Sequence, residues 1–376
     1  MLYYNITMVS SSSWIVKKVQ IMPNSLSKFS LKYNMISLTS SIVLALSACQ
    51  PTNHADSGEQ SAAHTQSASA AMTKNARPVI YASTNLWAAV AQAVAGDSAQ
   101  VIAAVDNPAQ DPHGYQASAR DKANMQQAAV VLMNGGGYDD WVQQIVQSLD
   151  PAPSVLNAVA ISQPHANTSH AQENTATHTH DTKDGSPHHH HHGEQNEHVF
   201  YQLAAVQQVA NAIAQELSTA NPTQQATYQQ NAATFNAQLD QLKIEARKIG
   251  QGKHLQALAT EPVADFLLAD MGITNVTPPE FVNQLANDEG VSVKALHTAE
   301  QLLAQQQVDI LVLNAQTEDP ASRALRKMAE NMHIPVVTVY ETLPTDTTNY
   351  IDFMRATIER FAAASQETPK TRVITD

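Results

Sequence analysis

Residues 78–105 read PVIYASTNLWAAVAQAVAGDSAQVIAAV, and this stretch decides the fold class. The β-branched run from Val79 to Ala82 predicts a strand, and Asn85 to Ala95 predicts a helix. A second strand is predicted from Val101 to Val105. A helix of about ten residues between two short strands is typical of a strand–helix–strand unit with parallel strands. The stretch therefore indicates an α/β protein.

The same alternation continues along the chain on both sides of a long helical region. Further strands are expected at Ala129–Met133, Leu255–Ala259, around Val276, at Val308–Leu313 and at Ile334–Tyr340. Further helices are expected at Ala117–Gln127, Tyr138–Leu149, Val199–Leu217, Val263–Met271, Val293–Gln307, Ala321–Met332 and Asn349–Ala364. These patterns predict two lobes, each with a mostly parallel sheet flanked by helices.

A long helix is predicted between the lobes, from the break at Asn221-Pro222-Thr223 to about Ile249. Its apolar stripe, at three- to four-residue spacing, consists of Ala226, Tyr228, Phe235, Leu239 and Leu242. We expect this helix to act as a rigid linker. The expected division of the chain is a signal peptide at 1–49, a flexible tether at 50–77, an N-terminal lobe at 78–221 with a histidine-rich loop at 163–197, the linker helix at 222–250 and a C-terminal lobe at 251–376.

The beginning of the chain has the pattern of an export signal. Lys28 and Lys32 precede an apolar run from Ile36 to Ala48, which is too short to be a convincing membrane span. Leu46-Ser47-Ala48-Cys49 resembles the bacterial lipobox, whose cysteine is lipidated; the alternative is an ordinary signal peptide with a chance cysteine. We expect an exported cell-envelope or periplasmic protein, anchored by a lipid at Cys49.

Composition and charge exclude some classes of partner and some kinds of stabilisation. The chain has 376 residues, of which 43% are hydrophobic, enough for two domains with a buried core. Its formal charge is −13, and loss of the four lysines before Cys49 takes it to −17. So acidic a surface repels phosphate backbones, and we expect no nucleic-acid partner. Cys49 is the only cysteine, so a disulfide within the mature domain is excluded. We expect a monomer that touches the membrane only through its lipid.

Residues 163–197 interrupt the alternation of strands and helices. They contain no apolar run and hold nine of the chain's 16 histidines, namely His165, His170, His178, His180, His188, His189, His190, His191 and His192. This composition predicts a disordered loop with affinity for metal ions. A purification tag is disfavoured because the run lies deep inside the chain. We expect the loop to collect or sense zinc with low affinity.

Four other residues are candidate metal ligands, namely His113, His198, Glu261 and Glu341. His113 lies in Asp111-Pro112-His113-Gly114-Tyr115, where proline restricts the backbone of the loop. Three of the four come after predicted strands, and ligands of open α/β sheets bind beyond the carboxyl ends of strands. Each also has an ordinary alternative: a surface histidine, a further member of the histidine-rich loop, a partner of a helix dipole or a solvated acid.

The run Asp111 to Tyr115, with Asn134-Gly135-Gly136-Gly137-Tyr138-Asp139-Asp140-Trp141 further on, resembles the cluster A-I metal-binding proteins of ABC importers. That family includes zinc-uptake and manganese-uptake lipoproteins, and the resemblance covers roughly residues 78–364. It implies two α/β lobes bridged by a rigid helix, with the metal ion between them. The ligands that it implies are His113, His198, Glu261 and, by position rather than by identity, Glu341.

The identity of the metal stays open at this point. In the family a histidine at the third ligand position goes with zinc and a glutamate with manganese, so Glu261 favours manganese, whereas the histidine-rich loop favours zinc. Two imidazoles and two carboxylates bind zinc in a tetrahedral arrangement. We expect Zn²⁺, with Mn²⁺ as the alternative, to be delivered to an ABC transporter permease in the inner membrane. Glu318 and Asp319 are fallback candidates for the position of Glu341.

Two other classes of function compete with transport. A secreted zinc hydrolase uses similar ligands, but the chain contains no His-Glu-x-x-His and no Gly-x-Ser-x-Gly motif, so we expect no enzyme. A metal-storage or adhesion lipoprotein is the other alternative, in which the histidine-rich loop carries the whole function.

Overall fold

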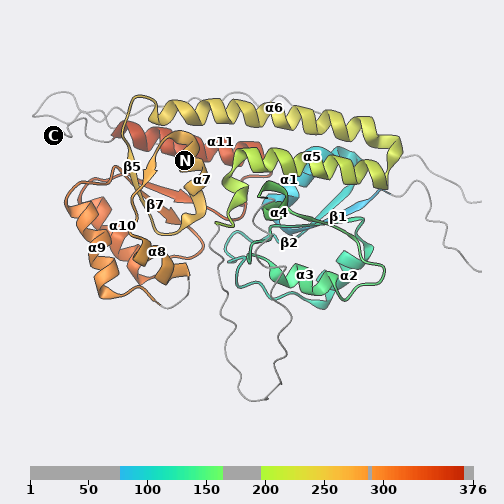
Figure 1. Cartoon of the computed structure of the whole chain (residues 1–376), viewed down its shortest axis with the longest axis horizontal. Helices are drawn as coiled ribbons and strands as arrows, with labels where there is room; N and C mark the ends of the chain where they lie inside the picture. Colours follow the sequence, from blue (N-terminus) through green and yellow to red (C-terminus); the bar gives the residue numbers. More distant parts are fainter. Residues whose placement is uncertain (1–76, 164–195, 287–289, 368–376) are drawn as a thin grey trace, which may run out of the picture. The chain divides into compact units, whose positions relative to one another are not determined.

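Two parallel β-sheets organise the fold, as Figure 1 shows. This computed structural model describes residues 77–163, 196–286 and 290–367. The expected signal peptide with Cys49, residues 50–76 of the expected tether and the nine histidines of the expected loop lie outside the described residues.

The first sheet contains four strands in the order β2-β1-β3-β4, and all its pairs are parallel. The strands are β1 (Val79–Thr84), β2 (Gln100–Val105), β3 (Val130–Met133) and β4 (Ser154–Asn157). β4 and the short helix α4 (Ala158–Ser162) after it were not predicted. Both are too short to show a clear hydrophobic period, so β4 is recognised only through its pairing with β3.

The second sheet repeats this arrangement in the order β6-β5-β7-β8, again with all pairs parallel. Its strands are β5 (Gln256–Ala259), β6 (Thr274–Asn275), β7 (Ile310–Asn314) and β8 (Val336–Val339). The expectation that Val276 belongs to a strand was wrong by one residue, although its N–H still donates to the carbonyl of Ala257 at 2.9 Å. In each sheet the strand order reverses between the first and third strands, and ligands of such sheets bind at this point.

Alternate residues of the strands face different helical layers. In β1, Ile80 packs with the cluster that includes α1 (Asn85–Ala95), whereas Tyr81 packs with α2 (Ala119–Gln127) and α3 (Asp140–Val146). In β7, Val312 joins the first of these clusters, and Leu311 packs against the other helices of its own lobe. Those helices are α8 (Pro279–Ala286), α9 (Val293–Ala304) and α10 (Pro320–Asn331). Helices therefore cover both faces of each sheet, as predicted.

The long helix α6 (Gln225–Gly250) packs along its length rather than standing free between the lobes (Figure 1). It contacts α1, α5 (Leu203–Ala220), α7 (Asp265–Met271) and α11 (Tyr350–Glu367). One continuous buried cluster contains residues of both sheets and of α6. Most of the predicted apolar stripe is buried, but Ala226 is exposed because it lies in the first turn, ahead of the packed segment.

Several predicted helix boundaries were wrong at the ends. The helix expected from Val199 begins with a separate 3₁₀ turn (Val199–Tyr201), and that expected from Val263 has a 3₁₀ turn (Pro262–Ala264) before α7. The helix expected to reach Gln307 ends at Ala304, and α8 was not predicted. Apolar periodicity continues through such turns, so the sequence pattern does not mark these breaks.

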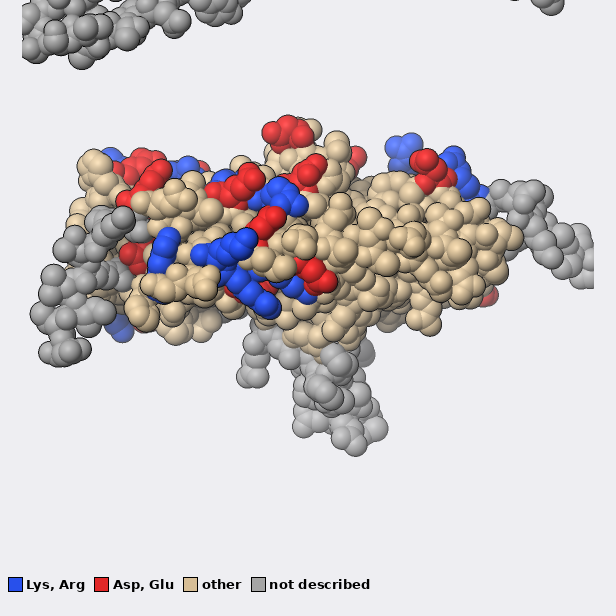
Figure 2. All heavy atoms as spheres, turned by 90° about the horizontal axis from the view of Figure 1, so that it is seen from above, with Lys and Arg blue, Asp and Glu red and all other residues tan. Residues whose placement is uncertain are grey.

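The face seen in Figure 2 carries its charges unevenly. Basic and acidic side chains are intermixed over the part that includes the second half of α6, and no large region of one sign appears there. The first half of α6, from Gln225 to Leu239, has no charged residue. Within the described residues, no helix combines the length and apolar character needed to cross a bilayer.

Substitution of Gly250 tests how α6 packs on the second lobe. A Cβ at this position would lie 2.3 Å from the carbonyl oxygen of Met271, a backbone atom that cannot move aside easily. Gly250→Ala should therefore lower the free energy of unfolding by about 1–3 kcal/mol, although alanine in an open helix is favoured by about 1 kcal/mol. Urea unfolding measures the change, with the exposed Gln229→Ala of the same helix as control. Unchanged or increased stability would contradict this contact.

Candidate metal centre

Three of the four predicted ligands lie together. His113 is in the loop after β2, His198 immediately precedes the 3₁₀ turn at Val199, and Glu341 follows β8. One donor atom of each lies within 4.8 Å of the donor atoms of the other two. Glu341 and His198 are buried, with 0% and 3% of their surface exposed, and His113 is partly buried. Residues separated by up to 228 positions thus form one group of metal-capable atoms.

A single carboxylate oxygen faces both imidazoles. Oε2 of Glu341 lies 3.1 Å from Nε2 of His113 and 3.7 Å from Nε2 of His198. The second distance is beyond that of a hydrogen bond. Nε2 of His198 is fully buried and has no hydrogen-bond partner. A buried nitrogen without a partner is costly, and a bound cation would remove this cost.

Asn196 fixes the orientation of the His198 ring. Its Oδ1 lies 2.8 Å from Nδ1 of His198 and also accepts the backbone N–H of that residue at 2.9 Å. Its Nδ2 donates to the carbonyl of Pro262 at 2.8 Å, so the oxygen end of the amide must face the histidine. In the neutral ring, Nδ1 therefore carries the proton and donates a hydrogen bond to Oδ1 of Asn196, and Nε2 keeps its lone pair. Metal-bound histidines are held by such a contact at their second nitrogen.

The loop of His113 is held by its flanking residues. Oδ1 of Asp111 accepts the backbone N–H of His113 at 2.9 Å. Further along, Asp121 accepts hydrogen bonds from the hydroxyls of Tyr81 at 2.6 Å and Tyr115 at 3.0 Å, and it forms a capping box with Ser118. These contacts tie the loop to β1 and to the start of α2, which restricts where the imidazole can lie.

The segment from Asn134 to Tyr138 supports both histidines. The Asn134 amide donates to the carbonyl of Glu197 at 2.9 Å, directly before His198. The Tyr138 ring packs 4.5 Å from the His113 ring and 6.1 Å from the His198 ring, measured between centroids. Gly135 has a φ of +80°, and a Cβ there would lie 2.1 Å from the side chain of Asn157. Glycine at position 135 is therefore needed for the turn that places the Tyr138 ring against the two histidine rings.

The fourth predicted ligand, Glu261, is a close neighbour but not a member of the group. Nδ2 of Asn314 donates to Oε2 of Glu261 at 2.8 Å and to Oε1 of Glu341 at 2.6 Å. The Thr317 hydroxyl donates to the other oxygen of Glu261. Sequence reasoning missed Asn314, Asn196 and Tyr138 as parts of the site, because amides and an aromatic ring at these positions carry no ligand signature.

The fallback candidates make contacts outside this group. Oε1 of Glu318 pairs with Nε of Arg326 at 2.8 Å. Oδ1 of Asp319 accepts the backbone N–H of Ser322 at 2.7 Å and caps α10. Both acids therefore have structural roles in the second lobe, and neither belongs to the group formed by His113, His198 and Glu341.

Charges within the group reinforce one another. Burial lowers the pKa of His113, but the hydrogen bond to Glu341 and the charge of that residue outweigh it and raise the pKa to about 9. Burial also lowers the pKa of His198, but the negative charge of Glu341, 3.7 Å away, outweighs it and raises the pKa. Burial raises the pKa of Glu341, yet the two histidines hold it well below its usual value. Burial and the charge of Glu341 both raise the pKa of Glu261. The attraction between the two imidazoles and Glu341 thus raises the pKa of each histidine and lowers the pKa of the carboxyl group.

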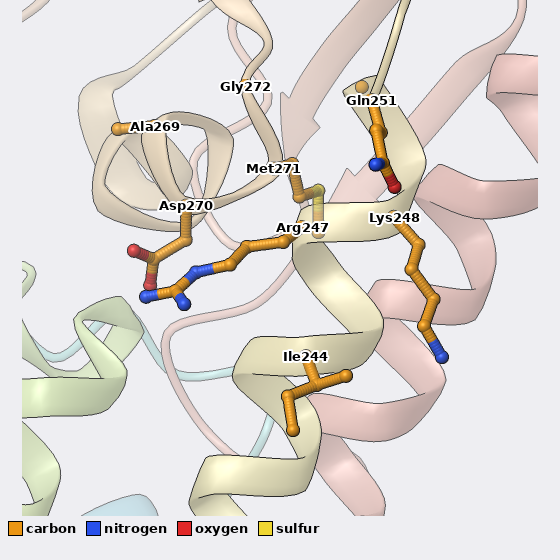
Figure 3. Close-up of a pocket in the computed structure, with 9 residues that line it drawn as sticks. Ile244, Arg247, Lys248, Gln251, Ala269, Asp270, Met271 and Gly272 are labelled. Atoms are coloured by element: carbon orange, nitrogen blue, oxygen red, sulfur yellow. The ribbon is translucent and has the colours of Figure 1, made fainter.

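A separate hollow lies between the end of α6 and α7 (Figure 3). Arg247 and Lys248 come from α6, and the Asp270 side chain points toward Arg247. None of the four predicted ligands lines this hollow, and its charged groups have opposite signs. It is therefore separate from the group formed by His113, His198 and Glu341.

Residues 80–364 match the family described as zinc-uptake complex component A, periplasmic, and the chain belongs to this family. The zinc-binding lipoprotein AdcA of Streptococcus pneumoniae is 23% identical over 271 residues, which cover 71% of this chain and 51% of AdcA. The chain thus spans about half the length of that relative.

Two solved structures share the fold. TroA, a periplasmic zinc-binding protein from Treponema pallidum, aligns with a TM-score of 0.60 at 14% identity, over 77% of this chain and 99% of TroA. FpvC from Pseudomonas aeruginosa, in complex with Mn²⁺, aligns with a TM-score of 0.58 at 19% identity, over 78% of this chain and 99% of FpvC. The predicted two-lobed α/β fold is confirmed.

The charge balance predicts how the stability of the metal-free protein depends on pH. The pKa of His113 in the folded protein is about 9, above its ordinary value of 6.5. A histidine whose pKa is higher in the folded than in the unfolded protein stabilises the fold. This stabilisation is complete at pH values below the pKa of the unfolded state, and it is lost as pH rises through the pKa of the folded state. Unfolding free energy should therefore fall between about pH 6.5 and pH 9. Glu341→Gln should flatten this slope, and the exposed His254→Gln should leave it unchanged. An unaltered slope in Glu341→Gln, measured by urea unfolding, would refute the coupling.

Proposed function

We propose that this protein captures a divalent metal ion, zinc, between its two lobes and delivers it to the permease of an ABC importer. His113 and His198 supply one nitrogen each, and Glu341 supplies one oxygen. Glu261 supplies the fourth donor by releasing its contact with Thr317, while its other oxygen stays on Asn314. Membership of the periplasmic zinc-uptake family supports this proposal.

One observation carries the proposal. Donors from distant parts of the chain converge, those of His198 and Glu341 are buried, and Nε2 of His198 has no hydrogen-bond partner. A purely structural group would satisfy that nitrogen, because an unpaired buried polar atom costs about 1–3 kcal/mol. The second nitrogen of His198 is held by Asn196, which leaves Nε2 available to a cation.

The donor set favours zinc over manganese. Imidazole nitrogens suit zinc, and the order of divalent affinities places Zn²⁺ well above Mn²⁺ for a mixed nitrogen and oxygen site. Two carboxylates also suit manganese, and FpvC is a structural relative described with that ion. Manganese is therefore the alternative, and direct competition between the two ions decides between them.

Ligands from both lobes explain how binding is coupled to the arrangement of the lobes. Other contacts already join them: the Asn85 amide pairs with the backbone of Leu343, and Nε2 of Gln316 donates to the carbonyl of Pro108 at 3.1 Å. A metal ion held by His113 and Glu341 adds to these contacts. It favours the arrangement of the lobes in which these two side chains lie together, to the extent that it binds this arrangement more tightly than one in which they are apart. A permease that distinguishes the two arrangements would then select the loaded protein.

The remaining expectations complete the proposal. The chain is exported and anchored by a lipid at Cys49, which is supported by its periplasmic family and by the lipoprotein AdcA among its relatives. The histidine-rich residues 163–197 serve as an accessory zinc-collecting segment. The protein acts by binding and release rather than by catalysis.

His113→Ala should remove the tight metal site. Loss of one ligand should weaken zinc binding by more than about 100-fold, because even the outer partners of a ligand contribute about 10- to 100-fold. Competition with a chromogenic chelator measures the affinity, and the exposed His254→Ala serves as control. If metal storage by the histidine-rich segment were the whole function, His113→Ala would barely change the amount of zinc bound.

Deletion of residues 164–193 separates the accessory segment from the site. The deletion variant should keep one tight zinc per chain and lose the weaker binding, because the proposed ligands lie outside the deleted residues. Equilibrium dialysis followed by elemental analysis counts both classes of zinc. Loss of the tight zinc would refute an accessory role for the segment.

A further inference from the structure

Asn314 lies at the point where the two acids of the centre meet. It is the last residue of β7 and only 3% of it is exposed. Its Oδ1 accepts the backbone N–H of Gln316 at 3.2 Å, which fixes the amide so that Nδ2 faces the carboxylates. Nδ2 donates one hydrogen bond to Oε1 of Glu341 at 2.6 Å and the other to Oε2 of Glu261 at 2.8 Å. One neutral side chain therefore holds one oxygen of each acid.

This pairing limits what the acids can offer to a metal. Because Oε1 of Glu341 is bonded to Asn314, only Oε2 faces the two histidines. The Glu341 backbone is also fixed, since its N–H donates to Oε1 of Gln316 at 3.1 Å. In Glu261, Oε2 is bonded to Asn314, so only the oxygen that now accepts from Thr317 is available. Neither acid can bind a metal through both of its oxygens unless its hydrogen bond to Asn314 is broken.

We propose that Asn314 is a positioning residue that sets the metal preference of the centre by restricting Glu341 and Glu261 to one oxygen each. The inference rests on the proposed function. With two imidazole nitrogens, two single oxygens give four donors, which matches the tetrahedral coordination of zinc. Manganese prefers a larger, oxygen-rich shell, which these acids reach by binding through both oxygens. Asn314 thus disfavours manganese without touching the ion itself.

A purely structural role for Asn314 makes a different prediction. In that case its loss would lower stability and weaken the binding of every metal in proportion, with the coordination number unchanged. If Asn314 restricts the acids, its loss should weaken zinc binding little and strengthen manganese binding. The ratio of the two affinities and the coordination number therefore separate the two roles, and neither depends on how stable the variant is.

The test compares Asn314→Ala and Asn314→Leu with the unaltered protein. Both substitutions remove the donor, and leucine has a similar shape and adds no charge, so it tests the proposal even if the alanine variant does not fold. In each, the ratio of zinc to manganese affinity should fall at least about tenfold, a size typical of partners of metal ligands. Cobalt(II) added as a probe should change from the strong visible absorption of four-coordinate cobalt to the weak absorption of six-coordinate cobalt.

Asn275 provides a matched control. It also ends a strand, β6, and its Nδ2 donates to a carboxylate, that of Asp265, at 2.8 Å. Asn275→Ala should lower stability but leave the affinity ratio and the cobalt spectrum as they are. If the Asn314 variants also leave both unchanged, or if cobalt in the unaltered protein is already six-coordinate, the inference is overturned while the metal-binding proposal stands. If His113→Ala does not weaken zinc binding in the unaltered background, both fail.

Discussion

The fold brings one buried carboxylate against two imidazoles, and the rest of the structure serves this contact. Glu341 is fully buried, and a lone carboxylate at such a depth is unfavourable unless positive charge compensates it. His113 and His198 face this carboxylate, and its charge raises the pKa of both imidazoles, which favours their positively charged forms. In the proposed function, a divalent cation bound to these side chains compensates the carboxylate through direct bonds. Its binding would displace the protons of the imidazoles, because only a deprotonated nitrogen binds a metal.

Two copies of the same sheet topology place the supporting residues beside this contact. Each sheet has its second strand outside the first, so the loops after the first and third strands open at a common crevice. Glu261 follows the first strand of the second sheet, Asn314 ends its third strand, and Asn134 follows the third strand of the first sheet. Because α6 packs against helices of both lobes, the sheets share one buried cluster, and the ligand loops start from a common framework.

The sequence predicted the fold class and most elements, because their apolar periods are long and flanked by breaks. It failed for β4, α8 and the 3₁₀ turns, where the segments are short and tertiary pairing decides the conformation. For the site, the places of His113 and Glu341 after strands made them candidate ligands, and the structure brings them together with His198. The roles of Asn196, Asn314 and Tyr138 could not be predicted, because each depends on contacts between residues that are far apart in the chain. Their partners become visible only in three dimensions.

The central claim is that one metal ion bridges the two lobes at His113, His198 and Glu341. Anomalous diffraction from a crystal of the zinc-loaded protein tests it most directly. The account predicts a single strong zinc peak at about 2.0–2.2 Å from Nε2 of both histidines and from one oxygen of Glu341, the usual lengths of zinc bonds to nitrogen and oxygen. A fully occupied zinc site elsewhere, with these three side chains in their metal-free positions, would contradict it.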